Sequence, residues 1–212
     1  MPGPRTYVYV DGFNLYHRLL EPNPALKWLN LEAWCSRLLP QSQVDRIRYF
    51  TAHVKARPND VSKPARQHAY LRALATLPIV SVHLGQFKTR ERCMWLKAPT
   101  PGGPNTALVL YEEEKRSDVN LATYLLVDGF RGLYELAVVI SDDSDLKLPI
   151  EMVTNELNLP VWVLNPQQGQ GGDLHTVATQ HRILRVGPLR ASQFPANMTD
   201  AVGPFNKPPT WA

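Results

Sequence analysis

The chain has 212 residues and a formal net charge of +4 at pH 7. This length predicts one large domain, or one domain with an elaborated tail, that can bury a sizeable core. The mildly basic charge is compatible with a polyanionic partner but does not require one.

Cysteine placement and short apolar runs exclude several classes of protein. Cys35 and Cys93 form no C-x-x-C pair and have no histidine at ligand spacing, so we expect reduced thiols in a cytoplasmic protein. The apolar run before Asp11 is too short for a signal peptide or a spanning helix, and no other run approaches that length. We therefore expect no membrane partner.

The first predicted strand covers residues 6–10 and ends on an acid. Asp11 is followed by a helical pattern that continues through Leu20. Taken singly, Asp11 fits a helix N-cap and Asn14 a turn residue. In an open α/β sheet, however, sites form where loops leave the carboxyl ends of the strands. Asp11 is therefore also a candidate site residue.

The next part of the chain predicts two helices and two strands. They are a helix at residues 31–39, a strand at 44–54, a helix at 65–76 and a strand at 79–84. Four cations cluster after the strand at 44–54, namely Lys55, Arg57, Lys63 and Arg66. A basic helix face is usually only solvated, but arginine suits phosphate recognition, so these four are candidate substrate-binding residues.

A basic segment with an aromatic residue covers residues 87–97. Two interpretations are open, a nucleic-acid contact through charge and stacking, or an edge hairpin blunted by lysine and arginine, and the second is slightly favoured. A turn at residues 100–105 and a strand at 107–111 follow. We expect the acids at 112–114 to form a solvated charge run.

A helix that opens at Ser117 carries the next acid of interest. Asp118 lies in phase with its apolar face, which comprises Leu121, Ala122, Leu125 and Leu126. If this helix crosses to a following parallel strand, right-handed β-α-β geometry places its first turn at the carboxyl edge of the sheet. Asp118 would then lie beside Asp11, whereas Asp128 is expected to be an ordinary helix-end residue.

Residues 137–140 predict a strand that is buried on both faces and stops at Ser141. Three carboxylates follow at once, at Asp142, Asp143 and Asp145. One of them fits an ordinary turn or helix cap. Because like charges so close together repel unless a cation lies among them, a divalent metal site is the alternative interpretation.

The rest of the chain predicts one more repeat of the same layering. We expect a helix at residues 148–156, a strand at 161–164, a flexible loop at 165–172 and a short helix at 174–181. Residues 1–186 then form the folded domain. Residues 187–212 are proline-rich, and we expect an extended arm that packs on the body.

Three segments together resemble the NYN domain family, which comprises PIN-like, ribonuclease-type domains also called LabA-like. They read VYVDGFNLYH, EEKRSDVNLATYLLVD and VVISDDSDLKLPI. The residues that match the family pattern, in order, are Asp11, Asn14, Asp118, Asp143 and Asp145. This sequence departs from the pattern at Arg116, where glycine is common, and at Asp142, where glycine or asparagine is common.

The resemblance implies a PIN-like Rossmannoid fold, an α/β three-layer sandwich with a central parallel sheet, and metal-dependent cleavage of RNA. Hard oxygen ligands without cysteine or histidine favour Mg²⁺ or Mn²⁺. Asp11, Asp118 and Asp143 are the expected metal ligands, and Asp145 is a ligand or a water-orienting base. Asn14 is expected to position the phosphate or a ligand carboxylate.

Three other functions are alternatives to a metal-dependent ribonuclease. A haloacid-dehalogenase-like phosphatase needs a second aspartate two residues after Asp11, where this chain has Phe13. A catalytically silent RNA-binding module, or a small-molecule enzyme that reuses the acidic site, would keep the same fold. A homo-oligomer is compatible with the sequence, but no feature of the sequence requires one.

Overall fold

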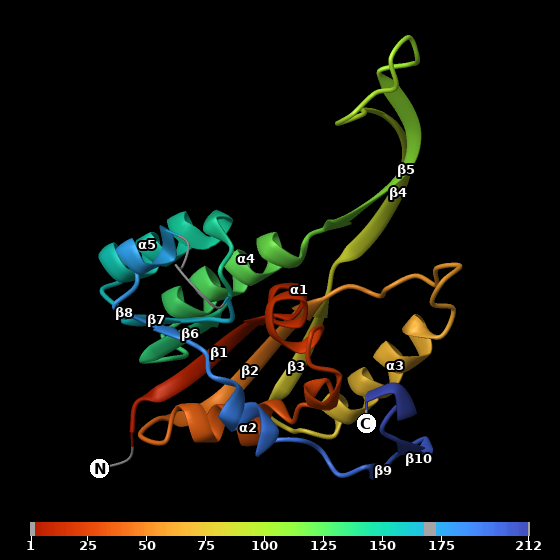
Figure 1. The fold of residues 1–212 in the computed structure, drawn as a ribbon. Coiled ribbons are helices and arrows are strands. Elements are labelled where there is room, and N and C mark those ends of the chain that lie inside the picture. Colours follow the sequence, from red (N-terminus) through yellow and green to blue (C-terminus); the bar gives the residue numbers. More distant parts are fainter. Residues whose placement is uncertain (1–2, 168–172, 212) are drawn as a thin grey trace.

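The structure is a computed structural model that describes residues 3–167 and 173–211. Within these residues, six parallel strands form a central sheet in the order β3-β2-β1-β6-β7-β8 (Figure 1). Their bounds are β1 Arg5–Asp11, β2 Gln43–Thr51, β3 Val80–Leu84, β6 Leu136–Ile140, β7 Val161–Asn165 and β8 Gln180–Ile183. The chain goes from β1 to β2 on one side and later returns to β6 on the other, so β1 and β6 form the topological switch point.

Helices cover both faces of this sheet, which confirms the predicted three-layer α/β sandwich. Successive residues of β1 alternate between two cores, with Val8 and Val10 in one and Tyr9 in the other. The first face carries α1 Gly12–Leu15, a π-helical turn Tyr16–Leu20, α2 Leu31–Leu38 and α3 Lys63–Ala75; the second carries α4 Ser117–Phe130 and α5 Lys147–Asn155. In the described part of the chain, no helix combines the length and apolarity needed to cross a membrane.

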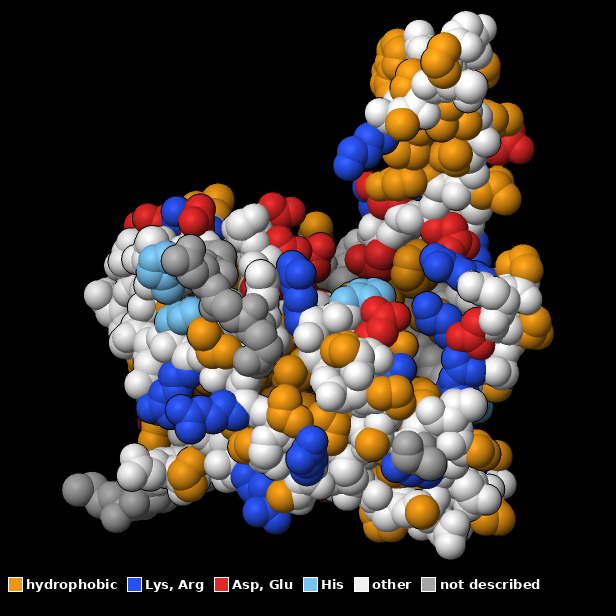
Figure 2. Space-filling model, viewed as in Figure 1, with side chains coloured by type: hydrophobic (Ala, Val, Ile, Leu, Met, Phe, Trp, Pro, Cys, Tyr) orange, Lys and Arg blue, Asp and Glu red, His pale blue; other side chains and the backbone are white. Residues whose placement is uncertain are grey.

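A long hairpin projects from the body beside α4 (Figure 1), and the space-filling view shows that it stands clear of the body (Figure 2). Its antiparallel strands are β4 Gln86–Trp95 and β5 Thr106–Lys115. The basic segment at 87–97 is thus part of a hairpin, although this hairpin extends away from the central sheet instead of blunting its edge. The prediction of a solvated acidic run at 112–114 was wrong, because these partly buried residues belong to β5. Glu114 accepts a hydrogen bond of 2.7 Å from the Ser117 hydroxyl.

The C-terminal part has more regular structure than the sequence predicts. Where we expected a helix at 174–181, the chain forms a 3-10 turn, Asp173–Thr176, and then β8, whose pairing with β7 outweighs the local helical spacing. Beyond it lie α6 Val186–Arg190, the hairpin strands β9 Asn197–Asp200 and β10 Gly203–Asn206, and a 3-10 turn, Pro209–Trp211. Part of the expected flexible loop, residues 168–172, lies outside the described residues.

The last elements pack on the α2 and α3 side of the body. Phe205 and Trp211 are both 8% exposed, and their ring centres lie 6.3 and 6.0 Å from that of the fully buried Trp28. The indole nitrogen of Trp28 also donates a 2.8 Å hydrogen bond to the carbonyl of Pro195. An aromatic cluster therefore attaches the C-terminal segment to the first helical layer.

Candidate metal centre

Asp11 occupies the carboxyl end of β1 and has two structural partners. Its Oδ1 accepts a 2.9 Å hydrogen bond from the Asn14 amide and so caps α1, as expected for an N-cap. Its Oδ2 accepts a 2.9 Å hydrogen bond from the hydroxyl of Ser141, the residue that follows β6. Burial raises the pKa of Asp11, although these hydrogen bonds oppose the shift. Asp11 is therefore a cap and also a buried acid at the switch point.

Asp143 reaches the same place from the end of β6. Its backbone amide donates a 3.1 Å hydrogen bond to the Ser141 hydroxyl oxygen, and its Oδ1 accepts one of 3.0 Å from the Asp145 amide. Ser141 was not among the site residues predicted from the sequence. Its position between the strand and the acids was the available signal, because hydroxyl side chains readily bond backbone groups two residues away.

Asp118 comes from the first turn of α4, as the helical phase predicts. Arg116, the N-cap residue of α4, turns the chain into the helix with a left-handed backbone conformation, φ of 87°. Glycine is favoured in that region, which accounts physically for the family preference noted above. Burial, followed by the charges of Asp11 and Asp143, raises the pKa of Asp118 to about 7.

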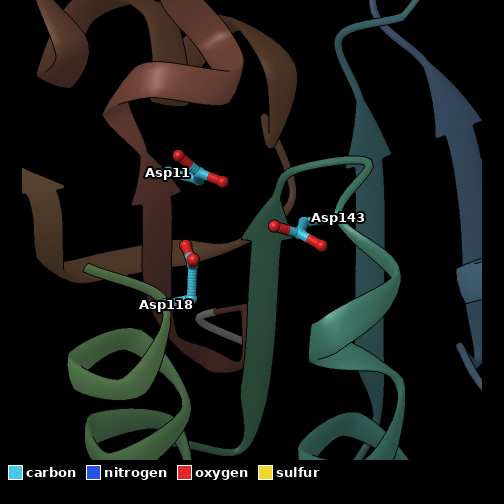
Figure 3. Close-up of side chains that lie close together, drawn as sticks. All are labelled: Asp11, Asp118 and Asp143. Carbon is cyan, nitrogen blue, oxygen red and sulfur yellow. The ribbon is translucent and has the colours of Figure 1, made fainter. Parts of the chain in front are cut away.

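Asp11, Asp118 and Asp143 converge on one point (Figure 3). Each offers a carboxylate oxygen, and these oxygens all lie within 4.8 Å of one another. Asp11 is 4% exposed and the other two are half-buried, so water screens their repulsion only partly. The set suits a hard divalent cation such as Mg²⁺ or Mn²⁺, which takes carboxylate oxygens and completes its shell with water. Asp145 is exposed and lies outside this triad.

The extra acid of this sequence, Asp142, faces elsewhere. Its carboxylate pairs with Arg18 at 3.1 Å and accepts a hydrogen bond from the Asn14 side-chain amide, and its side chain is only 3% exposed. The Asn14 oxygen in turn accepts a 3.2 Å hydrogen bond from the Asp142 backbone amide. The Asn14 side chain thus ties the ends of β1 and β6 together, while its backbone amide bonds Asp11, one of the three converging carboxylates.

The four predicted substrate-binding cations divide into two groups. Lys55 and Arg57 lie at the base of the hairpin, where Lys55 donates to the Thr89 hydroxyl at 2.6 Å and Arg57 pairs with Glu112 at 3.1 Å. Lys63 and Arg66 instead line a pocket on the other face of the sheet, beside α1. Of the four cations, Lys55 and Arg57 therefore contact the hairpin that precedes α4, and Lys63 and Arg66 line the pocket.

Three comparisons with known proteins bear on this site. The sequence pattern of the NYN domain matches residues 5–184. The chain is 29% identical to 6-hydroxy-3-succinoylpyridine 3-monooxygenase HspA of Pseudomonas putida, over 98% of this chain and 75% of that protein. It also resembles the crystal structure of a Vibrio parahaemolyticus protein of unknown function, with a TM-score of 0.54, 15% identity, and coverage of 87% of this chain and 94% of the other. The protein belongs to the NYN domain family.

Proposed function

We propose that the protein hydrolyses phosphodiester bonds in RNA with Mg²⁺ or Mn²⁺ held by Asp11, Asp118 and Asp143. The observation that carries this proposal is the convergence of three carboxylates at the switch point of a NYN-family sheet. A bound ion would lower the pKa of a water molecule and offset charge on the phosphate.

The chain's own residues have separable tasks in this proposal. Ser141 holds the first and third carboxylates in register by bonding Asp11 and the Asp143 amide. Asp145 is exposed beside the triad and is free to orient a water molecule. Lys55 and Arg57, at the base of the hairpin, contact the phosphates that flank the scissile bond. In this proposal, residues at the ends of β1 and β6 and at the start of α4 hold the metal, and residues at the base of the hairpin bind the RNA.

A second candidate is an enzyme that acts on a small aromatic molecule. The relative named a 6-hydroxy-3-succinoylpyridine 3-monooxygenase favours it, because the match covers nearly the whole of this chain. The site described here supplies hard carboxylates alone, which suit metal-assisted hydrolysis better than a redox metal. Hydrolysis therefore remains our first proposal.

Incubation of the protein with an RNA pool separates these functions. We expect mass spectrometry to detect shortened RNA with Mn²⁺ and intact RNA with a chelator. Asp118→Asn should abolish cleavage, whereas Glu151→Gln, which removes an exposed carboxylate of α5, should leave it unchanged. Cleavage that survives exhaustive chelation, or equal activity of the two variants, would refute the proposal. RNA that binds but stays intact under all conditions would favour the silent RNA-binding alternative.

A further inference from the structure

The pocket lined by Lys63 and Arg66 is a recess on the face of the sheet opposite α4. It lies between α1 with its π-helical turn and α3, and encloses a cavity of about 80 Å³ that is open to solvent on one side. Five aromatic side chains contribute to its wall, Phe13, Tyr16, Tyr49, Tyr70 and Trp211. π-Helical turns are rare and often occur at functional sites. A cavity of this size and lining suits a single flat ring inserted from the open side.

The same recess gathers three cations. Lys27, Lys63 and Arg66 all line it. The ammonium of Lys27 lies 5.2 Å from the ring centre of Tyr16. Burial lowers the pKa of Lys27, and Arg66 and Lys63 lower it further, against the attraction of Glu21. Among the described residues, Arg66 pairs with Asp60, whereas Lys27 and Lys63 form no ion pair with a carboxylate.

Helix α3 adds positive potential at this point. Lys63, Arg66, Gln67 and Tyr70 are spaced so that they share one face of the helix, and all four line the recess. The first turn contains no acid, and Ser62 makes no side-chain capping bond. Because a helix amino end carries partial positive charge, acids are favoured there and lysine is not. The unfavourable charge arrangement is relieved if an anion occupies the recess.

We propose that this recess binds a small aromatic anion, a molecule that has one flat ring and a carboxylate or phosphate group. The ring packs against Tyr16 and Phe13, and the anionic group lies among Lys27, Lys63 and Arg66. Two sources share this chemistry, a free aromatic acid and a nucleotide at an RNA end. The inference does not rest on the proposed nuclease activity, because none of the three triad aspartates lines the recess.

Calorimetric titration of the full chain, without RNA or Mn²⁺, tests this proposal. The probes are 4-hydroxybenzoate and UMP, a nucleotide whose base is a single ring, with acetate as an anion that lacks a ring and benzyl alcohol as a ring that lacks charge. We expect saturable binding of at least one aromatic anion, and at least tenfold weaker binding of acetate and benzyl alcohol. Tighter binding of UMP would identify a nucleotide source, and tighter binding of 4-hydroxybenzoate would identify a free aromatic acid.

Two variants and a matched control connect any binding to the recess. Lys27→Gln and Lys63→Gln should each weaken the aromatic anion at least tenfold, whereas Lys97→Gln, which changes an exposed lysine of the hairpin, should not. Lys63→Gln should not lower the melting temperature, since it removes a cation from a helix amino end. Absence of binding by both aromatic anions at millimolar concentration would overturn the proposal, as would equal binding by all three variants.

Discussion

The Ser141 hydroxyl donates a hydrogen bond of 2.9 Å to Oδ2 of Asp11, across the gap between the ends of β1 and β6. The same oxygen accepts a 3.1 Å hydrogen bond from the backbone amide of Asp143. Ser141 is fully buried. One hydroxyl therefore orients two of the three carboxylates that form the candidate metal centre.

Replacement of this hydroxyl should impair the site more than the fold. We expect Ser141→Ala to lower stability by about 1–3 kcal/mol, because two buried groups lose their partner. It should also weaken Mn²⁺ binding and RNA cleavage, and Ser141→Thr should restore part of both. Melting curves, Mn²⁺ titration and a cleavage assay on the three proteins measure these effects. Parent-like Mn²⁺ affinity in Ser141→Ala would show that the hydroxyl does not position the ligands.

Removal of one triad charge should stabilise the metal-free protein. At pH 8, Asp143→Asn should gain on the order of 1 kcal/mol by relieving repulsion among the three carboxylates. For a domain of this size that corresponds to a rise of about 2–4 °C in melting temperature. Asparagine keeps an oxygen to accept from the Asp145 amide, so the local turn is retained. The same variant should lose cleavage and most of the stabilisation by Mn²⁺.

Thermal melts with chelator and with Mn²⁺ provide that measurement. If Asp143 only caps the short helical turn at 144–146, Asn should serve nearly as well and the two proteins should melt alike under both conditions. That result would remove Asp143 from the metal site.

Asp145 should behave differently from the triad. Because it is exposed and lies outside the three converging carboxylates, we expect Asp145→Asn to reduce cleavage at least tenfold while Mn²⁺ affinity falls less than threefold. Calorimetric Mn²⁺ titration and cleavage rates, measured on the same preparation, separate the two effects. A large loss of Mn²⁺ affinity would make Asp145 a ligand instead of a water-orienting group.

Stability below neutral pH should depend on His83. Burial, and then the Arg48 guanidinium, lowers the pKa of this imidazole from 6.5 to about 4, against the attraction of Asp128. The Ser81 hydroxyl and Arg48 lie 3.0 and 3.4 Å from its Nε2, and the ring stacks on Phe50. Between pH 6.5 and 4 the unfolded chain therefore binds a proton that the folded protein does not, and stability falls as the pH falls.

A variant without an ionisable side chain at position 83 isolates this effect. His83→Gln should lose less stability than the parent between pH 7 and 4, by on the order of 1 kcal/mol after allowance for solvent screening. Urea unfolding at a series of pH values gives the difference in free energy of unfolding between the two proteins. The contributions of carboxylates that both proteins contain cancel in this difference. Parallel curves for parent and variant would mean that His83 titrates normally in the folded protein.

The sequence was sufficient to predict the order of layers and the convergence of Asp11, Asp118 and Asp143, because strand ends and helix phase depend on local patterns. It was not sufficient for Asp128, which we predicted from the sequence to be an ordinary helix-end residue. Asp128 is 2% exposed, forms a two-point ion pair with Arg48 at 2.7 and 2.9 Å, and accepts a 2.8 Å hydrogen bond from the Tyr9 hydroxyl. Those partners come from β1 and β2.

The orientation of Asp142 also needed the tertiary structure. Three acids so close in sequence look equivalent, but Asp142 points away from the triad because it pairs with Arg18 on the π-helical turn and accepts a hydrogen bond from the Asn14 side chain. Likewise, β8 forms because β7 offers an edge for pairing, which local spacing at residues 174–181 does not reveal. Charge partners and sheet edges supplied by distant segments account for these differences.

Mn²⁺ binding to the acidic triad is the most direct test of the central claim. Calorimetric titration should give saturable Mn²⁺ binding to the parent protein and to the surface control Glu151→Gln, and at least tenfold weaker binding to Asp118→Asn and Asp11→Asn. Circular dichroism confirms that each variant is folded before titration. Equal Mn²⁺ affinity in all four proteins, or no binding to the folded parent, would contradict the assignment of Asp11, Asp118 and Asp143 as metal ligands.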